Sequence, residues 1–310
     1  MNPDGSWRFE DWRAVEPPAL EPLYRAECAR WRAALCWDYA ASCEIVEAAR
    51  RAGTVPGLVA RRDDGTVAAW TFFAPYEGVL QVGALVGDGD ASCRALLGAT
   101  LASRDATTVR AISCFLYPQS PQLAVSFAEA GFLVERHFYL GWDLRAGTGA
   151  RWVPPAGLSC GQDPGRDVAA AATLLRRSYG GSREGSCFAP DGLPHQWEHY
   201  VSGLLLSGGC GHYLPGASLD LREAGGELVG ITLVSRVSDE TAHLSQVAVD
   251  PARRGAGLGK ALVEESCRMA RGAGFQRMTL LVAESNRAAL DLYARLGFRG
   301  DQAFLHAVRG

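Results

Sequence analysis

Long apolar runs are absent from this chain of 310 residues. No stretch approaches the roughly 18 consecutive apolar residues of a membrane-spanning helix, so we expect no membrane partner. The first residues, MNPDGSWRFEDW, have neither the basic start nor the apolar core of a secretory signal peptide. Acidic and basic residues nearly balance, at a formal charge of −3 and a pI of about 6.1, so no basic excess indicates a nucleic-acid partner.

CxxC pairs are also missing, although the chain has nine cysteines. An odd number of cysteines without this spacing, and without a zinc signature, predicts no metal site and favours a reducing, cytoplasmic location. With 48% hydrophobic and 21% charged residues, the composition is that of an ordinary globular protein. Its length suits about two domains.

A glycine-rich segment, RGAGLGK, runs from Arg254 to Lys260 between an apolar strand and an amphipathic helix. Gly255, Gly257 and Gly259 remove the side chains that would keep a ligand away from the backbone. The start of a helix offers unpaired N–H groups and a partial positive charge, to which Arg254 and Lys260 add formal charge. The segment therefore predicts a binding site for a polyphosphate.

Two familiar phosphate motifs do not fit this loop. The lysine is not followed by Ser or Thr, as the P-loop pattern requires. The spacing GxGxG departs from the GxGxxG of dinucleotide-binding folds, and no acidic residue follows about 20 positions later.

A second pattern follows the loop. MTLLVAESN, from Met278 to Asn286, is typical of a buried strand that ends in a helix N-cap, either Ser285 or Asn286. Apolar residues then recur at helical spacing, and the helix ends at Gly297. Asn286 and Tyr293 are seven residues apart, two helical turns, and so lie on nearly the same face.

The loop pattern R-x-x-G-x-G and the later N-x-x-A-x-x-L-Y-x-x-x-G-F resemble two signatures of the GNAT superfamily, the acyl-CoA-dependent N-acyltransferases. The resemblance implies an α/β fold with a mixed twisted sheet and acetyl-CoA as the acyl donor. It also implies that a β-bulge splays the fourth strand, Thr241 to Val249, and exposes its backbone N–H groups. The donor-binding residues implied in this way are Val247, Ala248, Val249, Arg254, Gly255, Ala256, Gly257, Leu258, Gly259, Lys260, Asn286 and Tyr293.

The resemblance also assigns catalytic roles. Tyr293 would protonate the departing thiolate, since a tyrosine is protonated at neutral pH; the alternative is a tyrosine that only packs. For the base there are two candidates, His243 in the fourth strand and Glu284 beside Asn286. A structural histidine and a solvated glutamate are the alternatives. Asn286 would bind the pantetheine arm, cap its helix, or do both.

An internal repeat appears when the second half is moved back by 166 residues. Gly297 and Phe298 then align with Gly131 and Phe132. At this offset Asp88, Ala91, Cys93, Ser120 and Phe127 replace Arg254, Gly257, Gly259, Asn286 and Tyr293. We therefore expect two tandem GNAT-like domains, each a mixed sheet flanked by helices. Residues 1–150 would form a degenerate, structural or substrate-shaping copy and residues 151–310 the catalytic one, a layout similar to that of mycothiol synthases.

Other segments complete the expected organisation. Asp64-Gly65 and Gly225-Gly226 each mark a hairpin turn, and the Gly- and Pro-rich Leu144 to Asp167 is expected to be an irregular connector. The acceptor would lie against Tyr179 to Leu214, a segment rich in aromatic and titratable residues: Arg183, Glu184, Asp191, His195, Trp197, Glu198, His199 and Tyr200.

The expected function is transfer of acetyl from acetyl-CoA to the primary amine of a small molecule by direct attack, in a monomer or homodimer. Two alternatives remain open at this point. One is an acetyltransferase that acts on protein N-termini or lysines, and the other is a non-catalytic acyl-CoA-binding regulator. The intact pair Asn286 and Tyr293 argues against the regulator.

Overall fold

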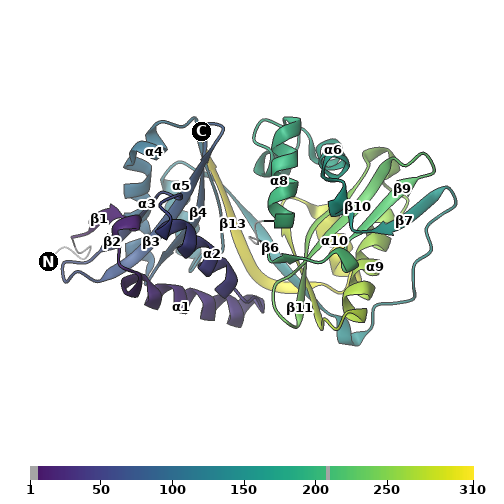
Figure 1. Cartoon of the computed structure of the whole chain (residues 1–310), viewed down its shortest axis with the longest axis horizontal. Helices are drawn as coiled ribbons and strands as arrows, with labels where there is room; N and C mark the ends of the chain where they lie inside the picture. Colours follow the sequence, from purple (N-terminus) through teal and green to yellow (C-terminus); the bar gives the residue numbers. More distant parts are fainter. Residues whose placement is uncertain (1–5, 207–209) are drawn as a thin grey trace. The chain divides into compact units, whose positions relative to one another are not determined.

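The structure, a computed structural model, describes residues 6–206 and 210–310 (Figure 1). Residues 1–5 and 207–209 lie outside the described residues; they include the start of the N-terminal segment and part of the expected acceptor segment. The chain divides into two compact units, Met1–Phe138 with Gln302–Gly310, and Tyr139–Asp301. Both combine helices with a mixed sheet, as the sequence predicts.

The first unit has the strand order β1-β2-β3-β4-β5-β13, in which only β4 and β5 pair in parallel. Helix α1 packs on one cluster of buried side chains and helices α3 and α5 on another. Its elements are β1 (Arg8–Asp11), α1 (Pro17–Leu35), α2 (Ala40–Arg51), β2 (Gly57–Arg61), β3 (Val67–Tyr76), β4 (Val79–Gly87), α3 (Asp90–Ala102), α4 (Arg104–Thr107), β5 (Ala111–Leu116), α5 (Pro121–Glu129) and β6 (Leu133–Asp143).

The second unit repeats this plan, with β11 and β12 as its parallel pair and the order β12-β11-β10-β9-β7. Helices α6 and α8 pack on one cluster and α9 on another. Its elements are β7 (Leu158–Gln162), α6 (Val168–Tyr179), α7 (Arg183–Phe188), α8 (Pro194–Leu206), β8 (His212–Tyr213), β9 (Leu219–Glu223), β10 (Leu228–Arg236), β11 (Thr241–Val249), α9 (Leu258–Gly272), β12 (Arg277–Ala283), α10 (Arg287–Leu296) and β13 (Arg299–Arg309).

Local sequence signals explain many of these boundaries. Both predicted hairpin turns are confirmed, since Gly65 and Gly226 adopt left-handed φ angles of 85° and 87° between paired strands. Asn286 is the N-cap of α10, where its side chain accepts the Ala289 N–H at 3.2 Å. Gly297 ends that helix at a φ of 105°, as predicted.

Two expectations about the chain's organisation need correction. The connector Leu144 to Asp167 is not irregular throughout, because β7 lies within it and pairs with β9. The single offset of 166 residues between the two copies does not hold for the elements before β5, since β4 and β11 differ by 162 positions. The reason is a difference in loop length: two residues join β4 to α3, whereas eight join β11 to α9. Asp88, Ala91 and Cys93 are therefore not the counterparts of the glycine loop, most of which the first unit lacks.

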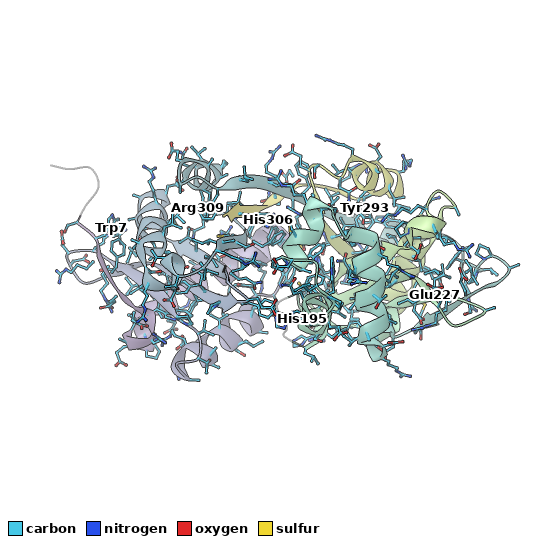
Figure 2. All side chains as sticks on the ribbon, turned by 90° about the horizontal axis from the view of Figure 1, so that it is seen from above. Trp7, His195, Glu227, Tyr293, His306 and Arg309 are labelled. Carbon is cyan, nitrogen blue, oxygen red and sulfur yellow. The ribbon has the colours of Figure 1, made fainter. Side chains whose placement is uncertain are left out.

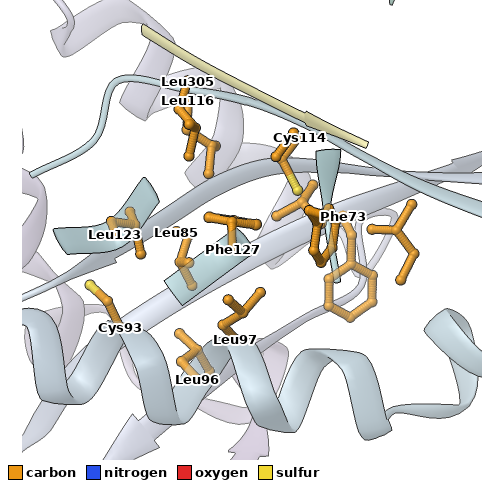
Figure 3. Close-up of a cluster of buried hydrophobic side chains, with 14 of the residues drawn as sticks. Phe73, Leu85, Cys93, Leu96, Leu97, Cys114, Leu116, Leu123, Phe127 and Leu305 are labelled. Atoms are coloured by element: carbon orange, nitrogen blue, oxygen red, sulfur yellow. The ribbon is translucent and has the colours of Figure 1, made fainter. Parts of the chain in front are cut away.

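The chain's last strand returns to the first unit, so the units do not divide at residue 150. The yellow β13 pairs antiparallel with β5, from Leu305 opposite Leu116 to Arg309 opposite Ile112 (Figure 1). Leu305 joins the buried cluster formed by β3, β4, α3 and α5 (Figure 3). The N-terminal unit is therefore completed by the C-terminal residues. Among the described residues, no helix has the length and apolarity to cross a bilayer.

Leu305→Ala should destabilise the first unit although the residue lies five positions from the C-terminus. Leu305 is 1% exposed, and removing such a side chain from a packed core costs about 2–5 kcal/mol. Urea unfolding followed by amide hydrogen exchange should show faster exchange in β4 and β5. Arg309→Ala, an exposed position on the same strand, is the control. Lost protection confined to residues 139–301 would contradict this assignment of β13.

Candidate active site

The centre of the second unit is a β-bulge in β11. Leu233 pairs with Gln246 but its neighbour Val234 pairs with Leu244, so the backbone of Ser245 has no register partner on β10, although its hydroxyl bonds that of Ser235 at 3.0 Å. On the other edge of β11, the parallel ladder with β12 runs only from Thr241 to Leu244. The second half of β11 is thus not paired with β12 among the described residues, and the splay implied by the family resemblance is present.

Beyond the bulge, alternate backbone groups of β11 face away from β10. The Asp250 N–H donates to Val229 on β10 at 2.9 Å, so the groups of Val249 and Val247 point to the opposite side. Two side chains of α6 reach this edge. The Tyr179 hydroxyl donates to the Val247 carbonyl at 2.7 Å, and the Ser178 hydroxyl to the Val249 carbonyl at 3.3 Å.

Gln246 links this edge to the neighbouring helices. Its side-chain oxygen accepts from Tyr179 at 3.3 Å and from the Val247 N–H at 3.1 Å, while its amide donates to Tyr200 at 3.2 Å. No sequence pattern marks Ser178, Tyr179 or Gln246 for these contacts. Ser178 and Tyr179 bind backbone carbonyls of a strand about 70 positions away in the sequence, and Gln246 connects that strand to Tyr179 and Tyr200.

The glycine loop presents a row of backbone donors. Gly255 and Gly257 have left-handed φ angles of 83° and 76°, and α9 begins at Leu258. Within the described part of the chain, the N–H groups of residues 255–260 have no hydrogen-bond acceptor; the first intrahelical bond joins the Ala261 N–H to Gly257 at 3.1 Å. Residues 251–257 are all exposed. Successive unpaired donors at a helix start form an anion-binding site.

Cationic side chains surround this row. The Arg254 guanidinium donates to the Ser178 carbonyl at 2.7 Å, which ties the loop to the end of α6. Lys260 lies one turn into α9, with its ammonium 3.7 Å from Glu264 on the exposed face. An added β-carbon would meet nothing within 4 Å at Gly255 or Gly257, and at Gly259 it would meet only Val249, at 3.7 Å. Glycine is therefore required at Gly255 and Gly257 by their left-handed φ angles and not by lack of space.

Tyr293, which Figure 2 labels, is buried on α10 and 5% exposed. Its ring meets that of Phe298 edge-on, with the ring centroids 5.6 Å apart. The first unit repeats this packing, since Phe127 meets Phe132 edge-on at 5.0 Å. The ring is therefore structural in both units, and the hydroxyl is what distinguishes the second. Burial, and after it the charge of Glu184, raises the pKa of Tyr293 well above its usual value.

The two expected bases lie in different environments. His243 is fully buried: its Nδ1 is 2.9 Å from the Thr279 hydroxyl, and its ring stacks on Tyr139 at 5.9 Å. Burial lowers the pKa of His243 to about 3, so the imidazole is neutral near pH 7 and accepts a further proton only weakly, which argues against the expected role as a base. Glu284 is half-buried in the turn between β12 and α10.

The equivalent edge in the first unit is closed. Its strand β4 has the same bulge, at Gly83, and its parallel ladder with β5 also ends one residue before the bulge, at Val82. The side chain of Gln119 then pairs with both backbone groups of Gly87, accepting from its N–H at 3.1 Å and donating to its carbonyl at 2.6 Å. Gly87 corresponds to Val249. A side-chain amide thus binds both the N–H and the carbonyl of Gly87, whereas at Val249 the Ser178 hydroxyl binds the carbonyl.

Within its described residues, the expected acceptor segment contains α7, α8 and β8. Trp197 is buried, whereas His195, Glu198 and His199 are exposed on α8. Phe188, Trp197 and Tyr200 pack together with ring centroids 4.6–6.4 Å apart. Glu184 differs from the rest of the segment, because the Asn286 amide donates to both its carboxylate oxygens, at 3.2 and 3.3 Å. No cluster of three or more metal-binding side chains occurs in residues 6–206 and 210–310.

Comparison with known proteins places this geometry in a family. Residues 175–298 match the sequence model of the Acetyltransferase (GNAT) family. Among curated proteins, the chain is 42% identical to the glucosamine 6-phosphate N-acetyltransferase of Trypanosoma brucei brucei over 60 residues, 19% of this chain and 39% of the relative. It is 39% identical to the mycothiol acetyltransferase of Thermomonospora curvata over 82 residues, 26% of this chain and 28% of the relative. The matches thus span well under half of these relatives.

Solved structures resemble the whole chain. A GCN5-related N-acetyltransferase from Sphaerobacter thermophilus has a TM-score of 0.67 at 18% identity, over 97% of this chain and 95% of its own. A tandem GNAT protein from the clavulanic acid biosynthesis pathway has a TM-score of 0.59 at 18% identity, over 82% of each chain. Residues 175–298 therefore match the GNAT acetyltransferase family, and the chain as a whole resembles solved GNAT structures in its fold, a tandem one among them.

In His243→Asn, the free energy of unfolding should fall less steeply than in wild type as the pH is lowered. The folded pKa of His243, about 3, lies below the unfolded value of 6.5, so the unfolded chain binds the proton more tightly. The contribution to stability is complete above pH 6.5 and falls by up to roughly 4–5 kcal/mol as the pH approaches 3. Urea unfolding at pH 7, 5.5 and 4 measures this loss. The exposed His212→Asn is the control, and an equally steep loss in His243→Asn would contradict the assignment.

Proposed function

We propose that this protein transfers acetyl from acetyl-CoA to the primary amine of a small molecule, and that only the second unit does so. The observation that carries the proposal is the row of unpaired N–H donors at residues 255–260 beside the half of β11 that has no β12 partner among the described residues. A diphosphate needs the first feature, and an amide-containing chain that ends in a thioester needs the second. In the first unit the loop is short, and Gln119 binds both backbone groups of Gly87.

The donor-binding roles follow from position. The N–H groups of residues 255–260 would hold the pyrophosphate, and Arg254 and Lys260 would neutralise its charge. The backbone of Val247 to Val249 would pair with the pantetheine arm and polarise the thioester carbonyl. The Asn286 oxygen caps α10 and its amide donates to Glu184, so both polar groups of this side chain already have a partner in the protein.

Tyr293 would protonate the thiolate as it leaves. Its raised pKa keeps the hydroxyl protonated at neutral pH, which a proton donor requires. Phe127 provides the internal comparison, because the unit with phenylalanine at this position also lacks the donor-binding loop. Small-molecule acceptors are supported by the names of the relatives, which refer to glucosamine 6-phosphate and mycothiol.

One molecule of acetyl-CoA should bind per chain, and Gly257→Asp should weaken its binding by well over tenfold. The aspartate brings a negative charge against the pyrophosphate and strains a residue at a φ of 76°. Calorimetry gives both the stoichiometry and the affinity. Gly274→Asp is a matched control, since it is exposed, has a φ of 98° and lies at the opposite end of α9. Two equal sites, or unchanged affinity in Gly257→Asp, would overturn the proposal.

Tyr293→Phe should lower kcat while the affinity for acetyl-CoA stays within about twofold. The phenylalanine keeps the ring packing against Phe298 and removes only the proton donor, whose help is worth about 10²–10⁴-fold at most. A free-thiol release assay against a panel of amines, amino acids and aminoglycosides gives kcat. Tyr213→Phe is the control, because that hydroxyl serves Gly165 and Asp163 instead. Turnover equal to wild type would reduce Tyr293 to a packing residue.

A further inference from the structure

The acidic side chain of Glu184 contacts Asn286, the N-cap of the helix α10 that carries Tyr293. Asn286 uses its oxygen to cap α10 and directs its amide at Glu184, with contacts of 3.2 and 3.3 Å to the two carboxylate oxygens. An amide that donates to both oxygens fixes the plane and the position of the carboxylate. The residue is half-buried, so the carboxylate is held in place and still reaches solvent.

The helix that carries Glu184 is itself fixed by close packing. The Ser182 side chain caps α7 by accepting the Gly185 N–H at 3.0 Å. Gly185 is buried, and a β-carbon at this position would collide with the Tyr179 carbonyl at the end of α6. Tyr179 in turn donates to the Val247 carbonyl on β11. The close packing of Gly185 on Tyr179 and the hydrogen bond from Tyr179 to Val247 therefore fix the position of Glu184 relative to the splayed strand β11.

The charge of Glu184 reaches the two tyrosines that line this region. It contributes, after burial, to the raised pKa of Tyr293 on α10. It also contributes, after burial and Tyr293, to the raised pKa of Tyr179 on α6, which Arg254 opposes. The carboxylate of Glu184 lies between the buried Tyr293 and solvent, and its negative potential would attract a cationic acceptor to this side of the proposed site.

We propose that Glu184 binds the ammonium group of the acceptor and removes its proton, with Asn286 holding the carboxylate in position. This assignment rests on the proposed function and names its substrate class, a protonated primary amine. Glu184 takes one proton from the ammonium, and the neutral nitrogen forms a C–N bond to the thioester carbon. As the C–S bond breaks, Tyr293 gives its proton to the thiolate and recovers one from the new amide nitrogen. Glu184 releases its proton to solvent, so one proton is released per turnover.

The other two candidates fit this role less well. His243 is sealed in the core between Thr279 and Tyr139, without exposure to an incoming amine. Glu284 lies in the turn before α10, whereas Glu184 is held by the Asn286 amide and, after burial, its charge raises the pKa of Tyr293. Glu184 thus combines partial exposure, a bound carboxylate and an effect on the proposed proton donor.

Glu184→Gln tests the proposal, because the amide keeps the shape and one oxygen for Asn286 but loses the charge. In the thiol-release assay with glucosamine, glucosamine 6-phosphate, lysine and kanamycin, kcat/KM for the amine should fall by about 10²-fold or more. The affinity for acetyl-CoA should stay within about twofold. The remaining rate should rise with pH as the free amine appears, whereas wild type should level off at a lower pH. Glu184→Asp should recover part of the loss.

Matched controls separate this role from a structural one. Glu227→Gln removes a carboxylate from a hairpin turn of the same unit, where its partner is Arg177, and should leave turnover and pH profile unchanged. His243→Gln should also keep the wild-type pH profile. A wild-type rate and profile in Glu184→Gln, or a profile altered only in His243→Gln, would overturn the proposal for Glu184 and leave the proposed function intact.

Calorimetry that measures binding of the same four amines to the CoA-bound protein distinguishes the ammonium site at Glu184 from the proposed acetyl transfer. Amines that bind wild type but not Glu184→Gln, without turnover, would uphold the ammonium site and overturn acetyl transfer. Amines that bind both proteins equally would overturn the site. Absence of both binding and turnover for all four would count against both claims.

Discussion

The proposed binding site of the second unit depends on one extra residue, the β-bulge at Ser245 in β11. The backbone of Ser245 has no register partner on β10, and the parallel ladder with β12 ends one residue earlier, at Leu244. Backbone groups that a regular sheet would pair are left for other partners. Tyr179 and Ser178 bind the carbonyls of this edge, and the loop that follows places six further N–H groups at a helix start. The fold thus concentrates backbone donors where a negatively charged, amide-containing ligand can use them.

The first unit shows that the bulge alone is insufficient. Its strand β4 has the same irregularity at Gly83 and the same short parallel ladder. There the amide of Gln119 satisfies Gly87, and two residues replace the eight that form the loop in the second unit. Both copies therefore keep the bulge, and they differ at the end of the strand: Gln119 binds both backbone groups of Gly87, whereas Ser178 binds the carbonyl of Val249. The first unit also includes the end of β13, which pairs with β5.

Side-chain patterns in the sequence predicted part of the fold and part of the candidate site. Glycines at Gly255 and Gly257, the cap at Asn286 and the ring at Tyr293 each leave a local signal, and the structure places each on the predicted element. The bulge in β11, the bond from Tyr179 to Val247 and the return of β13 left none, because they depend on backbone pairing between distant segments. The shortened loop was missed because a single offset fits both copies only after β5. Glu184 appeared among eight candidates, and only its contact with Asn286 distinguishes it.

Amide hydrogen exchange with and without acetyl-CoA tests the central claim most directly, because the claim concerns backbone N–H groups. Acetyl-CoA should slow exchange in residues 247–260, where the unpaired donors lie, and leave residues 79–93 of the first unit unchanged. Equal protection in both segments would contradict the account, since the edge beside Gln119 would then be open. Protection of the first unit alone, or of neither segment at saturating acetyl-CoA, would contradict it as well.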